Sequence, residues 1–254
     1  MDLQLPTTGL DRYKSASQRA RVVSEAWGEA NLYCPSCESP RLNRLPHNTA
    51  ALDYICPACD SPFQLKSQSK VIGGRINDAG YSAMKRTILQ DRTPNLYVLH
   101  YDLAGWSVQT IILIPRFAFT LSAVERRKPL AATARRAGWV GCNIVLKKIP
   151  EDARIALVSD GHVQEPGEVR KAYARLRPLA DLSIDARGWT LDVLNIVRSL
   201  NRTEFSLRDV YAHEEQLAKL HPKNLHVRDK IRQQLQVLRD MGLLHFLGRG
   251  HYRL

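Results

Sequence analysis

Four cysteines in two Cys-x-x-Cys pairs are the residues of this sequence whose spacing points most clearly to chemistry. Cys34 and Cys37 form the first pair, Cys56 and Cys59 form the second, and eighteen residues separate the pairs. Four thiolates at this spacing are typical of a tetrahedral zinc site. Because all four ligands are cysteines, the site would have no open position for catalysis. We therefore expect a structural Zn²⁺ ion.

An acidic residue and an amide-x-lysine triplet flank the second cysteine pair. Asp53 precedes the pair, and Gln64, Leu65 and Lys66 follow it. Phosphodiester cleavage needs oxygen ligands around a hard divalent cation and a positive charge near the attacking water. On paired strands, alternation would place Gln64 and Lys66 on one face, and the Leu65 carbonyl could also coordinate the cation. We interpret the pattern as a nuclease centre that binds Mg²⁺ (or Mn²⁺), and the alternative is a surface hairpin with a lone lysine.

The composition favours a polyanionic partner. The 254 residues include 37 Lys and Arg against 25 Asp and Glu, which gives a formal charge of +12 and an isoelectric point near 9.7. Such an excess favours nucleic acid through counterion release, although a surplus that serves only solubility is the alternative. We expect no secretory signal, because the first residues show no basic region followed by an apolar run. We also expect no membrane span, because no stretch approaches the roughly 20 apolar residues that a bilayer requires. Five cysteines, with Cys142 outside the pairs, suit a reducing cytosol.

Alternating helices and strands predict an α/β fold with a mixed sheet for the first part of the chain. Apolar spacing predicts helices over residues 13–29 and 77–90. Apolar runs predict strands over residues 96–101, 108–114 and 154–158.

The pattern changes after residues 177–188, a stretch containing Pro and Gly that we interpret as a linker. Beyond it, helical spacing is followed by two short strands joined by Gly-Arg-Gly, over residues 189–200, 206–220, 227–241 and 242–254. Ser206 and Asp209 have the spacing of a helix N-cap. Three helices closed by a terminal hairpin predict a winged-helix domain. We therefore place the domains at residues 1–183 and 184–254.

Two basic segments are candidates for DNA contact. The first, residues 126–139, contains Arg135, Arg136 and Trp139 and has no acidic residue. A solvated face and a tryptophan that anchors the loop are the alternatives. In the tail, seven Lys and Arg stand against two acids from residue 223 to the end, and Arg, Asn and Gln suit base edges in a major groove. The side chains that we expect to contact DNA there are Lys223, Asn224, Arg228, Arg232, Gln233, Arg249, His251 and Arg253.

The order of these motifs resembles that of the DpnI-type methyl-directed restriction endonucleases. The resemblance covers nearly the whole chain, and its most specific pieces are residues 76–78, 127–131, 133–139 and 230–236. It implies a PD-(D/E)XK nuclease domain and a separate winged-helix domain, each of which recognises methylated DNA. It further implies Mg²⁺-dependent cleavage of double-stranded GATC sites that carry N6-methyladenine, by a monomer in a prokaryotic cytoplasm.

The resemblance also assigns roles to individual residues. Asp53 and Gln64 match the metal-binding pair, Lys66 matches the catalytic lysine, and Trp139 matches a tryptophan near the adenine methyl groups. The four paired cysteines match the zinc ligands. One position departs from the family, which has Glu where this chain has Gln64. A neutral amide oxygen still binds Mg²⁺, but it removes one negative charge from the ligand set.

Three functions are therefore compatible with the sequence. The first is an endonuclease that degrades methylated DNA. The second, motivated by Gln64, is a regulator that binds methylated DNA through a catalytically decayed nuclease domain. The third is a zinc-containing adaptor whose winged helix binds protein, and the many cations on the third helix of the tail argue against it.

Overall fold

The computed structural model describes residues 1–46, 49 and 52–254. The chain divides into two compact units, each built from three segments. The first unit comprises Met1–Ile76, Arg92–Arg116 and Ala153–Ala174, and the second comprises Asn77–Asp91, Phe117–Asp152 and Arg175–Leu254. The boundary between residues 183 and 184 stays a prediction. In the described ranges, no helix has both the length and the apolar character that crossing a membrane demands.

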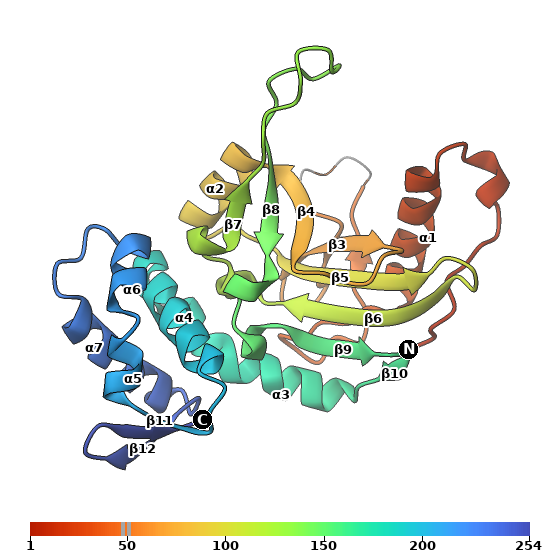
Figure 1. Cartoon of the computed structure of the whole chain (residues 1–254). Helices are drawn as coiled ribbons and strands as arrows, with labels where there is room; N and C mark the ends of the chain where they lie inside the picture. Colours follow the sequence, from red (N-terminus) through yellow and green to blue (C-terminus); the bar gives the residue numbers. More distant parts are fainter. Residues whose placement is uncertain (47–48, 50–51) are drawn as a thin grey trace. The chain divides into compact units, whose positions relative to one another are not determined.

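A mixed seven-stranded sheet forms the core of the first unit (Figure 1). Its order is β1 (Asn43–Arg44), β2 (Tyr54–Ile55), β3 (Pro62–Gln68), β5 (Asn95–Asp102), β6 (Ser107–Ile114), β9 (Ile155–Ser159) and β10 (His162–Val163). Strands β3 and β5 are parallel, and the other neighbouring pairs are antiparallel. The mixed sheet and its three predicted apolar strands are thus confirmed, because β5 and β9 bury most of their side chains and β6 buries half of its own.

Two helices of the first unit pack on this sheet. Helix α1 (Ala16–Asn31) begins at Ser15, whose side chain accepts a hydrogen bond from the Gln18 N–H. It contacts the sheet through a hydrogen bond between Ser24 and Ser67. Helix α3 (Pro166–Leu176) contacts β5 through the Tyr173 hydroxyl. Short 3-10 helices lie at Leu10–Arg12, Arg116–Ala118, Leu121–Ala123, Leu146–Lys148, Glu151–Ala153 and Arg177–Asp181.

The second unit contains a three-stranded sheet in the order β4-β8-β7, formed by β4 (Arg75–Gly80), β8 (Gly141–Val145) and β7 (Val124–Arg126). The prediction of one helix over residues 77–90 is wrong in its first part. Residues up to Gly80 are in β4, and helix α2 (Tyr81–Leu89) begins only after this glycine, whose backbone is extended. The buried pair of α2 is Met84 and Ile88, whereas the Ala79 carbonyl accepts a hydrogen bond from the Cys142 thiol in β8.

The C-terminal part of the second unit is a winged helix. It contains α4 (Ile184–Ser199), α5 (Leu207–Tyr211), α6 (Glu214–Leu220) and α7 (Val227–Asp240). A small sheet in the order β11-β13-β12 closes it, with β11 (Glu204–Ser206), β12 (His245–Gly248) and β13 (His251–Arg253). Strands β12 and β13 form the wing, and Arg249 and Gly250 at its tip have φ values of 47° and 76°. The left-handed turn is the reason for the glycine there.

Two predictions for the tail are wrong in detail. The segment predicted as a linker is largely helical, because Arg177–Asp181 is a 3-10 helix and α4 begins at Ile184 after the N-cap Ser183 and contains Arg187 and Gly188. The Arg187 guanidinium is buried and bonded to the Asp91 carboxylate and to backbone carbonyls, so it stabilises the helix start. The predicted second helix is two helices, α5 and α6. The capping box at Ser206 is confirmed.

Gly28 in α1 allows the close approach of Tyr54 from β2. A Cβ at this position would lie 2.9 Å from Tyr54 Cζ and would also overlap the hydroxyl, which donates to the Glu25 carbonyl. Because Tyr54 is fully buried, its ring cannot move aside. We expect Gly28→Ala to lower the free energy of unfolding by about 1–3 kcal/mol, measured by urea denaturation.

Gly167→Ala in α3 is the matched control. A Cβ there would have no neighbour within 4 Å, so the stability should stay equal or rise slightly. Equal stability of the two variants would contradict the proposed contact between α1 and β2.

Candidate metal centre and nucleic-acid interface

The four paired cysteines come together in the first unit. Their Sγ atoms lie within 4.8 Å of one another. Cys34 Sγ is 3.6 Å from Cys59 Sγ, and Cys37 Sγ is 3.5 Å from Cys56 Sγ. In a tetrahedral Zn–S₄ site with bonds of about 2.3 Å, sulfur atoms stand about 3.8 Å apart. The cluster can therefore hold a structural zinc ion.

Three cysteines of the cluster differ in the pKa of their thiols. Burial raises the pKa of the Cys34 and Cys37 thiols. At Cys56, burial is outweighed by the N–H groups of Ala58 and Cys59, which lower the pKa to about 7. The Ala58 N–H lies 3.4 Å from Cys56 Sγ. Because a metal binds thiolates, its charge would stabilise the buried sulfurs in their deprotonated form.

An arginine from α3 fixes the first cysteine loop. Arg170 Nε donates to the carbonyl oxygens of Cys34 and Cys37, at 3.2 and 3.0 Å. Its guanidinium also forms an ion pair with Glu38 at 3.2 Å and lies 5.3 Å from the centre of the Tyr33 ring. Residues far apart in the sequence thus fix the backbone that presents the first two thiols. Arg170 was not among the predicted site residues.

The second cysteine pair forms the turn between β2 and β3. Tyr54 pairs with Phe63, and the Cys56 N–H donates to the Ser61 carbonyl at 3.0 Å. In this antiparallel register Asp53 falls level with Gln64. The Asp53 N–H donates to the Phe63 carbonyl, and Asp53 Oδ2 accepts the Leu65 N–H at 2.8 Å. The structure therefore brings Asp53 beside the triplet of β3.

A cavity of about 200 Å³ opens beside Asp53. Glu25 of α1, which is only 7% exposed, lines it together with Asp53. The described residues around the cavity are Arg21, Glu25, Arg44, Leu45, Pro46, Thr49, Leu52 and Asp53. The Glu25 carboxylate pairs with Arg21 Nε at 2.5 Å and with the Arg44 guanidinium. Two carboxylates and two guanidiniums thus share this cavity.

The Asp53 carboxyl is unusually easy to protonate. Burial raises its pKa, and the nearby negative charge of Glu25 raises it further. The Leu65 N–H and the positive charges of Lys66 and Arg21 act in the opposite direction. A divalent cation beside Asp53 would favour the ionised form and would lower the pKa of this carboxyl.

Glu25, Arg21 and Arg44 were not among the predicted site residues either. Glu25 is an acid between Val23 and Trp27, both of which are buried in the apolar face of α1. Glu25 itself lies on the side of α1 that carries Arg21, four residues before it, and this acid–base spacing is the sequence signal for an ion pair there.

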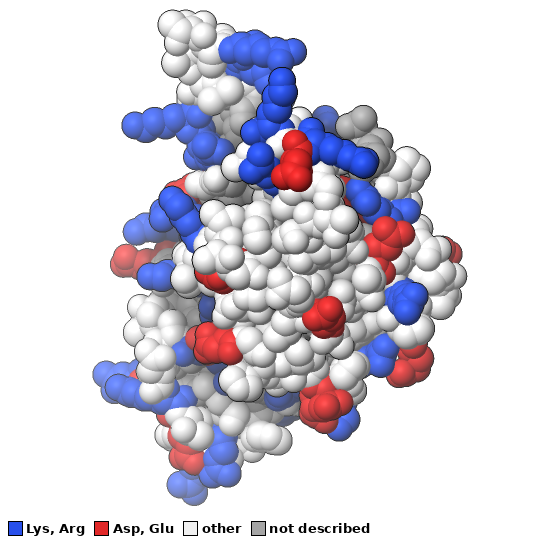
Figure 2. Space-filling view, turned by 90° about the vertical axis from the view of Figure 1, so that its right-hand side faces the viewer, with Lys and Arg blue, Asp and Glu red and all other residues white. Residues whose placement is uncertain are grey.

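Arg135, Arg136 and Trp139 lie in the long loop between β7 and β8, which protrudes from the second unit (Figure 1). Figure 2 shows Lys and Arg side chains gathered on this loop, at the top of the view. The Trp139 ring packs against Gly141, where a Cβ would come within 2.9 Å of it, and the Arg136 guanidinium lies 4.6 Å from the ring centre. The tryptophan thus anchors the base of the loop and remains half-buried.

The predicted contact residues of the tail lie on three adjoining segments. Lys223 and Asn224 are in the turn before α7, and Arg228, Arg232 and Gln233 are exposed on α7. The wing carries the remaining three, which are the exposed residues Arg249, His251 and Arg253.

Several of these cations have acidic partners on the surface. The pairs are Arg228 with Glu214 at 2.7 Å, Arg253 with Glu204 at 2.7 Å, and Arg232 with Asp229. Exposed pairs of this kind contribute at most about 1 kcal/mol, so they restrict these arginines only weakly.

The cysteine cluster leads to a direct test. Purified protein should contain about one zinc ion per chain, and Cys56→Ser should lower the zinc content and the melting temperature, because the turn between β2 and β3 loses a ligand. Elemental analysis and thermal melting measure the two effects.

Cys142→Ser is the matched control, because Cys142 is buried in β8 and a serine hydroxyl can keep its hydrogen bond to the Ala79 carbonyl. Folded wild-type protein without zinc would overturn this assignment.

Comparison with known protein families covers almost the whole chain. A family model described as the Dam-replacing family, DpnI, matches residues 1–182. A second model, described as the Dam-replacing HTH domain, matches residues 185–254. Both agree with the mixed α/β fold, the cysteine cluster and the helical C-terminal part. The family implies a methyl-dependent restriction endonuclease that binds DNA through its HTH domain. The chain belongs to the Dam-replacing family of DpnI-type proteins.

Proposed function

We propose that this protein is a Type II restriction endonuclease that cleaves double-stranded DNA at GATC sites carrying N6-methyladenine, with Mg²⁺ as cofactor. The observation that carries the proposal is the register of β2 and β3, in which Asp53 stands beside Gln64, Leu65 and Lys66. Family membership supports the nuclease class, and the resemblance of the motifs supports the methylated substrate.

The cation would be held by oxygen atoms of the chain. Asp53 and Gln64 supply a carboxylate and an amide oxygen, and the Leu65 carbonyl is the third candidate ligand. When bound, Mg²⁺ stabilises the charge that develops on the phosphate and lowers the pKa of a bound water. Lys66 on the same strand places a positive charge near the attacking water.

Glu25 supports activity in spite of the neutral Gln64. It lines the same cavity as Asp53, and its negative charge already raises the Asp53 pKa. The local charge from these two carboxylates equals that of an Asp and Glu pair on the two strands. Arg21 and Arg44, the ion-pair partners of Glu25, bring two positive charges that formally balance these two carboxylates.

DNA contact is assigned to the loop with Trp139 and to the winged helix, residues 184–254. Arg135 and Arg136 provide positive charge beside the half-buried Trp139 ring. On the winged helix, α7 offers Arg232 and Gln233 to base edges, and the wing offers cations to the phosphate backbone. We propose a monomer in a prokaryotic cytoplasm, in agreement with the motif resemblance.

A regulator that binds methylated DNA without cutting it is the second candidate. Gln64 favours it, because an Asp and Gln pair carries one formal negative charge instead of two. In that case the winged helix would keep its function, and the β2–β3 hairpin would serve only as a structural support.

A plasmid digest separates the two candidates. Full-length protein with Mg²⁺ should cut adenine-methylated plasmid and leave matched unmethylated plasmid intact. Lys66→Ala should abolish cutting, because the positive charge near the water is lost, while affinity for methylated duplex in a gel shift stays nearly unchanged.

Lys70→Ala is the matched control, because Lys70 is exposed and lies outside the triplet. No cutting of methylated plasmid in either Mg²⁺ or Mn²⁺, with binding retained, would favour the regulator.

The amide at position 64 should set the metal preference. Because an amide oxygen carries no formal charge, Mg²⁺ should bind weakly, and Mn²⁺ should support cutting better. Gln64→Glu should lower the Mg²⁺ concentration for half-maximal cutting, measured by metal titration of the digest. Glu25→Gln should raise it. An unchanged metal dependence of Gln64→Glu would exclude Gln64 as a ligand.

A further inference from the structure

Leu225 is the most exposed large apolar side chain in the described part of the chain. It is 88% exposed, and its neighbours in sequence, Asn224 and His226, are polar. A single exposed leucine on a protein surface is ordinary. Leu225 differs from an ordinary exposed leucine in its position in the fold.

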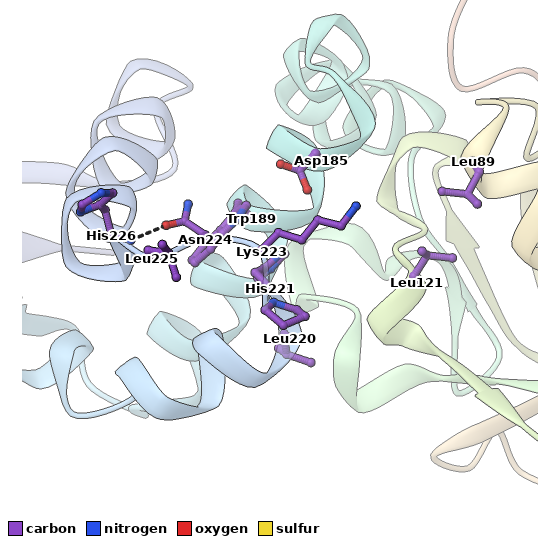
Figure 3. A pocket seen from close by; sticks show the side chains of 11 residues that line it. Leu89, Leu121, Asp185, Trp189, Leu220, His221, Lys223, Asn224, Leu225 and His226 are labelled. Atoms are coloured by element: carbon purple, nitrogen blue, oxygen red, sulfur yellow. Dashed lines mark hydrogen bonds between the residues drawn. The ribbon is translucent and has the colours of Figure 1, made fainter.

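Leu225 lies in the turn that leads directly into α7. His226 is the N-cap residue of that helix, and its N–H donates to Asn224 Oδ1 at 2.8 Å (Figure 3). The Asn224 N–H in turn donates to the His221 carbonyl at 3.0 Å. In HTH domains the N-terminal end of the recognition helix approaches the base edges in the major groove. The turn therefore presents Leu225 at the end of α7 that would enter the groove.

The turn is anchored to the body of the winged helix, so its exposure does not reflect a loose loop. The His221 ring stacks on Trp189 of α4 with 4.0 Å between ring centres. His221 Nε2 lies 2.9 Å from Asp192 Oδ2, and Asp192 Oδ1 accepts the Ser122 hydroxyl. A rigid support of this kind reduces the entropy lost when the side chain binds.

A large open cavity borders the same turn. Its volume is about 660 Å³, and Leu225 lines it together with Leu220 and Lys223 (Figure 3). Leu225 thus projects beside open space, where another molecule can reach it without displacing protein atoms.

We propose that Leu225 is a specificity-determining residue that contacts a methyl group on a base edge in the major groove. Polar side chains of α7 can read hydrogen-bonding groups, but a methyl group offers no hydrogen bond and is recognised by apolar contact. Two kinds of methyl group are available at the substrate site, the N6-methyl of adenine and the C5-methyl of thymine. The proposal rests on the proposed function, because it assumes binding to methylated duplex.

The test measures the affinity of the full-length chain for three short duplexes, each with one GATC site, in Ca²⁺ instead of Mg²⁺. The first duplex carries N6-methyladenine, the second is unmethylated, and the third carries N6-methyladenine with uracil in place of thymine. Leu225→Ala should weaken binding by about three- to tenfold wherever the contacted methyl group is present. Leu225→Met should keep most of the wild-type affinity.

The three duplexes identify the methyl group. A loss on both N6-methylated duplexes but not on the unmethylated one assigns the contact to adenine. A loss on both thymine-containing duplexes but not on the uracil duplex assigns it to thymine. An equal effect on all three, or no effect, overturns the proposal.

Leu220→Ala is the matched control, since Leu220 lines the same cavity from α6 but does not lead into α7. It should leave all three affinities unchanged, and a pattern equal to that of Leu225→Ala would overturn the proposal. If the wild-type protein fails to prefer methylated over unmethylated duplex, the proposed function itself fails, whatever the variants do.

Discussion

The register of β2 against β3 is the constraint on which the candidate metal centre depends. The turn between the strands contains Cys56 and Cys59, and the Cys56 N–H closes it on the Ser61 carbonyl. The pairing extends from this turn to Tyr54 and Phe63, which places Asp53 beside the triplet of Gln64, Leu65 and Lys66. A slip by one residue would turn every side chain of one strand to the other face. Strand β2 has only two residues, so its backbone hydrogen bonds to β3 are too few to prevent such a slip alone. The cysteine cluster at the turn therefore restrains the register.

The charges around the Asp53 cavity form a nearly balanced set. Buried carboxylates are stable only when they are paired, and Glu25 has two guanidinium partners. Asp53 instead has the Leu65 N–H and the more distant charges of Lys66 and Arg21. The arrangement leaves Asp53 as the carboxylate that gains most from an added cation. A neutral Gln64 fits this balance, since a third carboxylate there would add repulsion before any metal binds.

Local patterns in the sequence predicted more of the fold than of the cavity. The strands β5, β6 and β9 are continuous apolar runs, and the spacing of the cysteines identified their cluster, so both could be predicted. Glu25 and Arg170 could not, because their roles arise only when α1 and α3 pack against distant segments. The β4 strand was missed for a related reason: Ala79, Ala83 and Met84 fit a helical period, and only pairing within the sheet places Ala79 in a strand.

The surface ion pairs of the winged helix reconcile its stability with DNA binding. Arg228, Arg232 and Arg253 each have an acidic neighbour, which lowers repulsion within a basic domain. Because exposed pairs are weak, a phosphate or base edge can replace the acid at small cost. Much of the favourable free energy of DNA binding then comes from released counterions. This contribution falls as the salt concentration rises, and it does not depend on the DNA sequence. In the proposed function, discrimination between methylated and unmethylated DNA must therefore come from the few contacts that are not ionic.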